Sequence, residues 1–489
     1  MLTRRTFLGA LAKASLAAPA PRRNVLFIAS DDLNTCLSAY GHPLVKTPHI
    51  DRIARMGVRF DRAYCQFPLC SPSRTSLMTG MAPDTTTVYD LQKHFRTVLP
   101  ETTTLAQCFR RNGYVAKRVG KIYHYGVPGQ IGTDGLDDQA SWDAVVNPCG
   151  VDHTKEEPQL TNYTPTRGLG SAICFHDSPA GDEQHTDGIG ASEMIRLLEQ
   201  HRRDPFFLAM GFYRPHVPWI APRKYFDMVK KEDVRLIPFD EGEMHIAPEL
   251  AYFTKPGNWG MSESQRRDAM HAYYASIHFL DAQVGRLLGA LERLKLLDAT
   301  TIVFWSDHGY QLGEHGQWMK QTVFEPAARV PLFIAGPQVR ARGRACRWTV
   351  EFLDLYPTLV QLCGLGGAQA GLQGVSLKPL LDDPAARHVR PALTQVRRGN
   401  EKKAVMGHSI RTERYRYTMW ADGEQGEELY DYQTDPREMQ NLITGSRAPE
   451  TRAALRRQLD GILKTRGKGR VTQAALRAAQ REELDAVSD

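Results

Sequence analysis

The 489-residue chain lacks the patterns that mark several classes of protein. Its eight cysteines form no Cys-x-x-Cys pair and no cluster with histidine, so a structural zinc site is not expected. No stretch approaches the roughly 20 apolar residues of a membrane-spanning helix. No internal repeat or heptad pattern is evident, which argues against a solenoid or a coiled coil. The length predicts one large globular domain with a smaller one.

Most of the chain also lacks a charge excess. The net charge of +7 comes from the two ends, because residues 1–20 carry +3, residues 446–489 carry +4 and the stretch between them is neutral. A basic patch for nucleic acid is therefore not predicted. An anionic substrate would have to be bound by a few local cations.

The first twenty residues resemble an export signal. Arg4 and Arg5 precede a mildly apolar run from residue 8 to residue 20 that ends in small residues. This pattern predicts a twin-arginine signal over 1–20, with the twin-arginine export machinery as a partner. The mature protein would then be periplasmic or secreted, in a bacterium. The alternative is a tail that contains a chance pair of arginines.

Strand and helix patterns alternate along the rest of the chain. Short unbroken apolar runs predict strands that are covered on both faces, at residues 24–30, 206–211 and 300–306, and a further strand is predicted at 114–120. Amphipathic patterns predict helices at 48–56, 104–111, 188–201, 262–297 and around 350–362. The alternation predicts an α/β fold with a large, mainly parallel sheet flanked by helices.

The domain organisation expected from these patterns has a catalytic domain over 21–385, a smaller C-terminal subdomain over 386–445 and a basic helical tail over 446–489. Residues 147–186 are rich in proline, glycine, threonine and aspartate and predict a long irregular segment near the site. Within it, Cys149 and Cys174 flank a loop-like polar stretch and form a candidate disulfide, although sequence alone does not establish the pairing.

Two predicted strands end in side chains that bind cations. Asp31 and Asp32 follow the strand at 24–30, and Asp307 and His308 follow the strand at 300–306. Open α/β sheets place their ligands at the carboxyl ends of strands, and adjacent carboxylates repel each other unless a cation lies between them. A solvated acidic turn explains either pair alone, but the two together favour a shared metal site.

A third motif surrounds Cys70. Pro72 is placed to be the first residue of a helix with Ser71 as its cap, so Cys70 would lie just before the helix N-terminus, where an anion is favoured. Arg74 lies four positions after Cys70, close to one helical turn away. A buried cysteine before an ordinary helix is the alternative interpretation.

These residues resemble a known family. The run Cys70-Ser71-Pro72-Ser73-Arg74 is similar to the Cys-x-Pro-x-Arg signature of type I sulfatases, and the resemblance extends over roughly residues 24–445. The late stretch 429–442 is also typical of that family, and the segments that make the chain most similar to the iduronate-2-sulfatase branch lie at 47–51, 83–86, 120–124, 214–218, 306–309 and 313–320. The resemblance implies an alkaline-phosphatase-like fold, with a short antiparallel sheet in the C-terminal subdomain.

The resemblance also implies a cofactor chemistry. A separate formylglycine-generating maturation enzyme would convert Cys70 to formylglycine, whose hydrate is the nucleophile. One divalent cation, calcium in this family, would be bound by Asp31, Asp32, residue 70, Asp307 and His308. Because imidazole is a poor calcium ligand and many sulfatases carry asparagine in place of His308, the local chemistry also admits manganese or zinc.

Cationic and histidine side chains complete the implied site. Arg74 and Lys121 would hold the formylglycine hydrate, and His124 would assist its hydroxyl group. His216 and Lys320 would bind the sulfate ester, together with Lys121, and either His216 or Lys320 would protonate the leaving oxygen. Without the resemblance, solvated lysines and ordinary loop histidines explain the same residues.

The resulting hypothesis is a sulfuric ester hydrolase acting on a sulfated carbohydrate, with a uronate 2-O-sulfate of a glycosaminoglycan or another sulfated polysaccharide as the substrate. Two alternatives stay open. One is a hydrolase of phosphonate monoesters or phosphodiesters with the same fold, and the other is an inactive protein that binds sulfated glycans.

Overall fold

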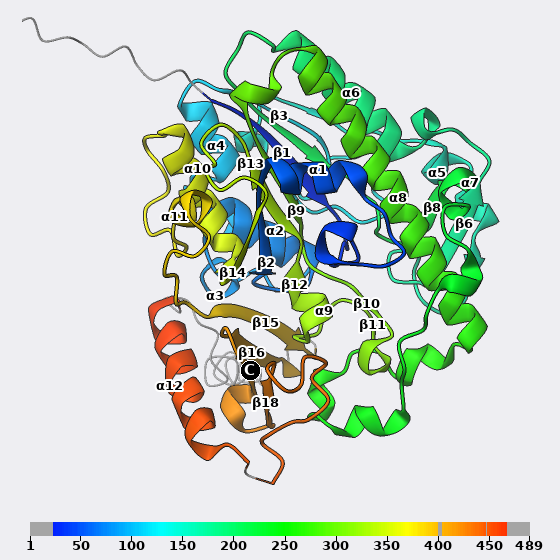
Figure 1. The fold of residues 1–489 in the computed structure, drawn as a ribbon, viewed down its shortest axis with the longest axis vertical. Helices are drawn as coiled ribbons and strands as arrows, with labels where there is room; N and C mark the ends of the chain where they lie inside the picture. The colour runs from blue at the N-terminus through cyan, green and yellow to red at the C-terminus, as the bar shows by residue number, and fades with distance from the viewer. Residues whose placement is uncertain (1–22, 400–402, 446, 467–489) are drawn as a thin grey trace, which may run out of the picture.

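The computed structural model describes residues 23–399, 403–445 and 447–466. A nine-stranded sheet forms its centre (Figure 1), with the order β12-β2-β13-β9-β1-β7-β3-β4 and β14 paired to β2. Its strands are β1 Asn24–Ser30, β2 Gly57–Tyr64, β3 Val115–Gly120, β4 Ala144–Val146, β7 Phe206–Gly211, β9 Thr300–Ser306, β12 Arg329–Val330, β13 Leu332–Ala335 and β14 Arg344–Glu351. Only β12 and β13 run against the others, which confirms the mainly parallel sheet.

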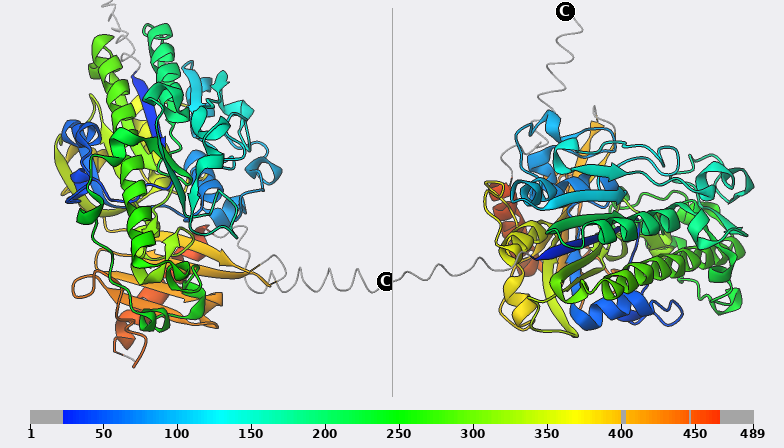
Figure 2. Two further views of the ribbon diagram at one scale, coloured as in Figure 1. Left: turned by 90° about the vertical axis from the view of Figure 1, so that its right-hand side faces the viewer. Right: turned by 90° about the horizontal axis from the view of Figure 1, so that it is seen from above.

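Helices cover both faces of this sheet, as Figures 1 and 2 show. One face packs against α1 Pro48–Met56, α6 Thr186–Gln200 and α8 Glu263–Arg293, and the other against α2 Cys70–Thr79, α4 Leu105–Arg111 and α10 Leu355–Cys363. The alternation along β1 explains the two layers, because Leu26 and Ile28 lie in the first core and Val25 and Phe27 in the second. The shorter helices are α3 Pro83–Thr86, α5 Val151–Thr154, α7 Arg223–Phe226, α9 Glu325–Ala328 and α11 Lys378–Asp382.

A second, four-stranded antiparallel sheet lies beside the first. Its strands are β15 Ala392–Arg398, β16 Val405–Arg411, β17 Tyr415–Trp420 and β18 Glu427–Asp431. Helix α12, Pro449–Arg466, packs on it through Leu455, Leu459 and Leu463, so one face of this predicted tail helix is buried. The boundary near residue 386 stays a prediction, and residues 1–20 and the end of the tail lie outside the described residues.

The segment 147–186 is more ordered than predicted. It contains α5 and contributes β5 Thr161–Asn162 and β6 Cys174–Ser178 to a three-stranded sheet with β8 Trp219–Pro222. The candidate disulfide is wrong, because Cys149 is exposed, Cys174 is buried, and both are free thiols. Among the described helices, none is long and apolar enough to cross a membrane.

Candidate active site

The two predicted metal-binding strand ends are neighbours. Strands β1 and β9 pair in parallel with Ser30 opposite Ser306, so Asp31 and Asp307 leave the sheet side by side. The Asp307 Oδ1 atom accepts hydrogen bonds from the backbone N–H groups of Asp32, at 3.2 Å, and His308, at 3.0 Å. Asp32 has a left-handed backbone with φ +65°. Contacts between the strand ends therefore fix both turns.

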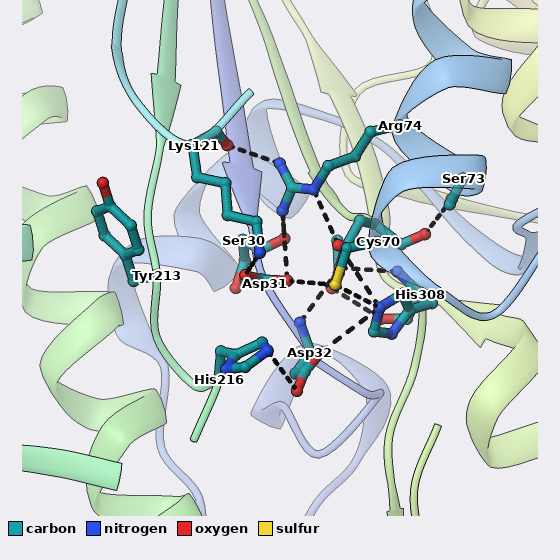
Figure 3. A network of polar contacts seen from close by, with 12 residues as sticks. Ser30, Asp31, Asp32, Cys70, Ser73, Arg74, Lys121, Tyr213, His216 and His308 are labelled. Carbon is teal, nitrogen blue, oxygen red and sulfur yellow. Dashed lines mark hydrogen bonds and ion pairs between the residues drawn. The ribbon is translucent and has the colours of Figure 1, made fainter. Parts of the chain in front are cut away.

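Strands β3 and β7 bring two further predicted residues to the same edge. Gly120 lies opposite Gly211, and Lys121, directly after β3, donates a hydrogen bond from Nζ to Asp31 Oδ2 at 2.5 Å. His216 follows β7, and its Nε2 atom lies 3.8 Å from Asp32 Oδ2 (Figure 3). The order of strands in the sheet thus assembles this half of the site.

Cys70 enters from helix α2. The predicted helix start at Pro72 with a Ser71 cap is wrong, because α2 begins at Cys70 and is preceded by extended Leu69. The N–H group of Ser73 already donates to the Leu69 carbonyl at 3.1 Å, which closes the first turn earlier. The Cys70 sulfur points between Asp31 Oδ1, at 3.5 Å, and His308 Nε2, at 3.3 Å (Figure 3).

Arg74 and Lys320 surround the sulfur with positive charge. Arg74 is fully buried, donates from Nε to Asp307 Oδ2 at 2.9 Å and lies 3.5 Å from Asp31 Oδ1. Lys320 follows the hairpin of β10 Gln311–Leu312 and β11 Trp318–Met319. Its Nζ atom lies 2.6 Å from Asp32 Oδ1 and 3.6 Å from the Cys70 sulfur. Nine of the ten predicted site residues are therefore joined by polar contacts.

His124 is the tenth. Among the described residues no hydrogen bond or ion pair joins its side chain to the other nine, and its buried Nδ1 atom has no hydrogen-bond partner. Burial, together with the nearby Lys121 ammonium, holds its pKa well below the usual value. His124 is therefore a neutral imidazole beside the cluster with an unused nitrogen.

The carboxylates of Asp31 and Asp32 differ in protonation. Burial alone raises a carboxyl pKa, but Lys121, His216 and Arg74 hold the pKa of Asp31 well below its usual range. Burial and the like charges of Asp31 and Asp307 raise the pKa of Asp32 to about 7, although Lys320 opposes them. The three carboxylates of Asp31, Asp32 and Asp307 thus lie among the three cations of Arg74, Lys121 and Lys320.

The residues fit a metal ion. Ligand atoms of Asp31, Asp32, Cys70 and His308 lie within 4.8 Å of one another, and the buried Asp32 Oδ2 has no hydrogen-bond partner. The His308 Nδ1 atom lies 2.9 Å from the carbonyl oxygen of Gly309, which only accepts, so Nδ1 carries the proton and Nε2 faces the cluster with a free lone pair. Burial lowers the pKa of His308 to about 4, which keeps it neutral.

The structure adds positioning residues that the sequence did not indicate. On α8 the Tyr273 hydroxyl donates to the Asp32 carbonyl at 2.8 Å and accepts from the Asn34 N–H at 2.9 Å. The Ser73 hydroxyl donates to the Asp307 carbonyl. Tyr273 and Ser73 thus contact the backbone of the turns after β1 and β9 and not the metal-ligand atoms. No spacing in the sequence links them to the strand ends.

Comparison with known proteins agrees with this geometry. The Sulfatase family profile matches residues 23–365, and a second profile, N-sulphoglucosamine sulphohydrolase, C-terminal, matches residues 313–465. The chain belongs to the sulfatase family. The predicted resemblance is thereby confirmed.

Individual relatives of this sulfatase differ in their substrates. It is 32% identical to iduronate 2-sulfatase of Homo sapiens over 86% of this chain and 91% of the relative. It is also 32% identical to choline-sulfatase of Rhizobium meliloti over 88% of this chain and 84% of the relative. A solved structure, phosphonate monoester hydrolase of Agrobacterium radiobacter, has a TM-score of 0.76 at 24% identity and covers 91% of this chain and 96% of its own. Similar solved structures confirm the alkaline-phosphatase-like fold.

Proposed function

We propose that this sulfatase hydrolyses the sulfuric ester of a sulfated sugar at a site built around residue 70. The observation that carries the proposal is the position of the Cys70 sulfur, 3.5 Å from Asp31 Oδ1, 3.3 Å from His308 Nε2 and 3.6 Å from Lys320 Nζ. A reacting group there adjoins both a cation site and a fixed ammonium. Negative charge develops on the sulfonyl oxygens in the transition state, and such fixed cations stabilise it most.

The proposal includes conversion of Cys70 to formylglycine by a separate maturation enzyme. Burial and the Asp31 carboxylate raise the pKa of the Cys70 thiol well above its usual value. An unconverted residue is therefore a protonated thiol and a weak nucleophile. The hydrate of formylglycine supplies two hydroxyl groups, one to attack sulfur and one whose collapse releases the product.

The proposal also includes one calcium ion. Asp31, Asp32, residue 70, Asp307 and His308 would hold it, and it would neutralise charge on a sulfate oxygen. The Asp307 carboxylate already accepts from Arg74 and two backbone N–H groups, so it also orients the loop. His308 provides the ligand that calcium favours least, and metal analysis of the purified enzyme distinguishes calcium from manganese or zinc.

The remaining side chains bind and move protons. Asp32 raises the pKa of Lys320 against the effect of burial, so Lys320 is charged and can hold a sulfate oxygen. The His216 Nδ1 atom contacts the carbonyl of Val217, which leaves Nε2 free to face the ester. His124 is neutral and has an unused nitrogen, and we expect it to accept a proton from residue 70.

The sugar is the finer part of the proposal. Similarity to a human iduronate 2-sulfatase supports a uronate 2-O-sulfate, but the equal identity to a choline-sulfatase means that overall similarity does not select the alcohol. Turnover of defined sulfated mono- and disaccharides selects it. Activity on the uronate 2-sulfate alone supports this assignment, and activity on choline sulfate alone overturns it.

A comparison of two chromogenic substrates tests the reaction itself. We expect enzyme carrying converted Cys70 to hydrolyse an aryl sulfate faster than an aryl phosphonate monoester, and Cys70→Ala to hydrolyse neither. A strong preference for the phosphonate favours the alternative function, a hydrolase of phosphonate monoesters or phosphodiesters, whose fold this chain shares. Binding of sulfated glycans without any turnover favours the inactive binding protein.

We also propose export by the twin-arginine route to the periplasm or the medium. Support comes from Arg4 and Arg5 before the apolar run, which lies outside the described residues. Replacing both arginines by lysine is expected to keep the enzyme in the cytoplasm of a bacterial host. Unchanged export of that variant contradicts the proposal.

A further inference from the structure

One cavity of the protein, of about 470 Å³, is rich in arginine. Five arginines line it, namely Arg59, Arg62, Arg329, Arg347 and Arg411, against the two carboxylates of Asp61 and Glu325. None of the ten proposed site residues lines it. In Figure 1 its strand β12 lies where the large sheet meets the four-stranded one. The wall is therefore built from segments that are distant in sequence and carries an excess of three positive charges.

Both carboxylates of the cavity already have partners. The Arg59 Nε atom donates to Asp61 Oδ1 at 2.7 Å. Glu325 Oε2 accepts from Arg416 at 2.6 Å and lies 3.4 Å from Arg411, while its Oε1 accepts from the Tyr64 hydroxyl. Among the described residues, no carboxylate lies within ion-pair distance of Arg62, Arg329 or Arg347. These three arginines of the cavity wall thus have no ion-pair partner among the described residues, although the Arg329 charge still acts on Glu325.

Contacts with the rest of the chain hold several of these arginines in place, whereas Arg347 is exposed. Arg62 donates to the backbone carbonyl of Arg347 at 2.7 Å, where a register shift between Cys346 and Thr349 distorts β14. The guanidinium groups of Arg59 and Arg329 lie 5.6 Å and 5.5 Å from the ring of Tyr40. The Arg329 Nε atom is buried and has no hydrogen-bond partner.

Such an arrangement matches a bound oxyanion. Guanidinium groups present planar forks of N–H donors that fit the oxygens of sulfate, phosphate and carboxylate. Like charges gathered around one ring repel each other, and a bound anion relieves that repulsion. The cavity shares Tyr40, Glu325, Arg329 and Pro436 with a neighbouring cavity of about 400 Å³, so the two together have more volume than a single small ion fills.

We propose that this arginine cavity is an oxyanion-binding site, separate from the active site, that takes sulfate groups carried by an oligosaccharide. The oxyanion class follows from the arginines, whereas the choice of a sulfate ester rests on the proposed function. The cavity would hold a second sulfated unit of a chain and so favour polysaccharide over small esters.

The test uses sucrose octasulfate as the probe, with sucrose as the unsulfated control, in calorimetric titrations of the full-length converted enzyme. Arg62→Gln/Arg347→Gln removes two uncompensated charges. Arg202→Gln/Arg203→Gln removes two charges from an exposed loop remote from the cavity wall and is the matched control. Turnover of a small aryl sulfate and the thermal midpoint of each variant report on the active site and on folding.

We expect the cavity variant to bind the octasulfate at least about tenfold more weakly, with aryl sulfate turnover unchanged. If inorganic sulfate competes with the octasulfate, the free ion is a second ligand of the cavity. If inorganic sulfate does not compete, the ligand is the sulfate ester. Equal binding by wild type and cavity variant, or an equal loss in the control variant, overturns the proposal. Absence of aryl sulfate turnover in the wild type overturns the proposed reaction. The octasulfate titrations still test the oxyanion site in that case.

Discussion

The Lys320 ammonium lies 2.6 Å from Asp32 Oδ1, although 288 positions separate the two residues in the chain. The contact joins the loop after β11 to the turn after β1 and places the ammonium 3.6 Å from the Cys70 sulfur. It therefore links the proposed cation site to residue 70. The predictions below follow from this arrangement and from its supports.

Removing the Lys320 charge should slow the reaction. In Lys320→Gln the amide keeps a hydrogen-bond donor but loses the charge that we propose faces the ester, so we expect kcat/KM for an aryl sulfate to fall roughly 10²- to 10³-fold. Lys224→Gln, at an exposed lysine on α7, is the control. A decrease smaller than about threefold would show that Lys320 does not stabilise the transition state.

Calcium should stabilise the folded enzyme through the four clustered ligands. An ion that binds only the native state adds about 2.7 kcal/mol to the free energy of unfolding at one hundred times its dissociation constant. We expect this gain in denaturant titrations of wild type and its absence in Asp32→Asn. The exposed Asp227→Asn should behave as wild type. Equal stabilisation of all three proteins would place the ion elsewhere.

The Tyr273 hydroxyl should act on the metal site without touching a ligand atom. Tyr273→Phe deletes a donor to the Asp32 carbonyl and an acceptor for the Asn34 N–H, so we expect calcium affinity to fall about tenfold and stability by about 1–2 kcal/mol. The adjacent Tyr274, whose ring contacts His42 instead, is the matched control as Tyr274→Phe. A loss of stability with unchanged calcium affinity would limit Tyr273 to a structural role.

Glu325 should make stability depend on pH in acid. Burial opposes its charge, but Arg411, Arg416 and Arg329 lower its pKa to about 2, from an ordinary value of 4.5. The folded state therefore releases this proton more easily than the unfolded chain. Its contribution, about 3 kcal/mol, is present above pH 4.5 and is lost as the pH falls toward 2.

Denaturant unfolding of wild type and Glu325→Gln between pH 2 and pH 7 measures this contribution of Glu325 to the free energy of unfolding. We expect the variant to be less stable near pH 7 and the two curves to converge in acid. If the free energies of unfolding of the two proteins changed in parallel over the whole pH range, Glu325 would not be the source of the pH dependence.

Sequence patterns located the elements that carry the site, because buried parallel strands are short apolar runs. The predicted strands at 24–30, 206–211 and 300–306 match β1, β7 and β9, and the helix at 48–56 matches α1. The predicted boundaries of the long helix, 262–297, extend a few residues beyond α8 at its C-terminal end. Local apolar periodicity is sufficient for these elements because each is covered by the core.

Other features depended on tertiary contacts that the sequence does not display. The start of α2 follows from an extended Leu69 and from the anchoring of Ser73 on the Asp307 carbonyl, which override the capping preference of Ser71. Strand β13 is antiparallel in a mainly parallel sheet, and its four residues carry no signal of direction. Tyr273 is one aromatic residue among many on the buried face of α8.

The most direct test of the central claim is mass spectrometry of the tryptic peptide that contains residue 70, on the same enzyme preparation whose aryl sulfate turnover has been measured. We predict that residue 70 carries an aldehyde in place of the thiol and that turnover rises in proportion to the converted fraction. An active preparation in which residue 70 is entirely a thiol would contradict the account.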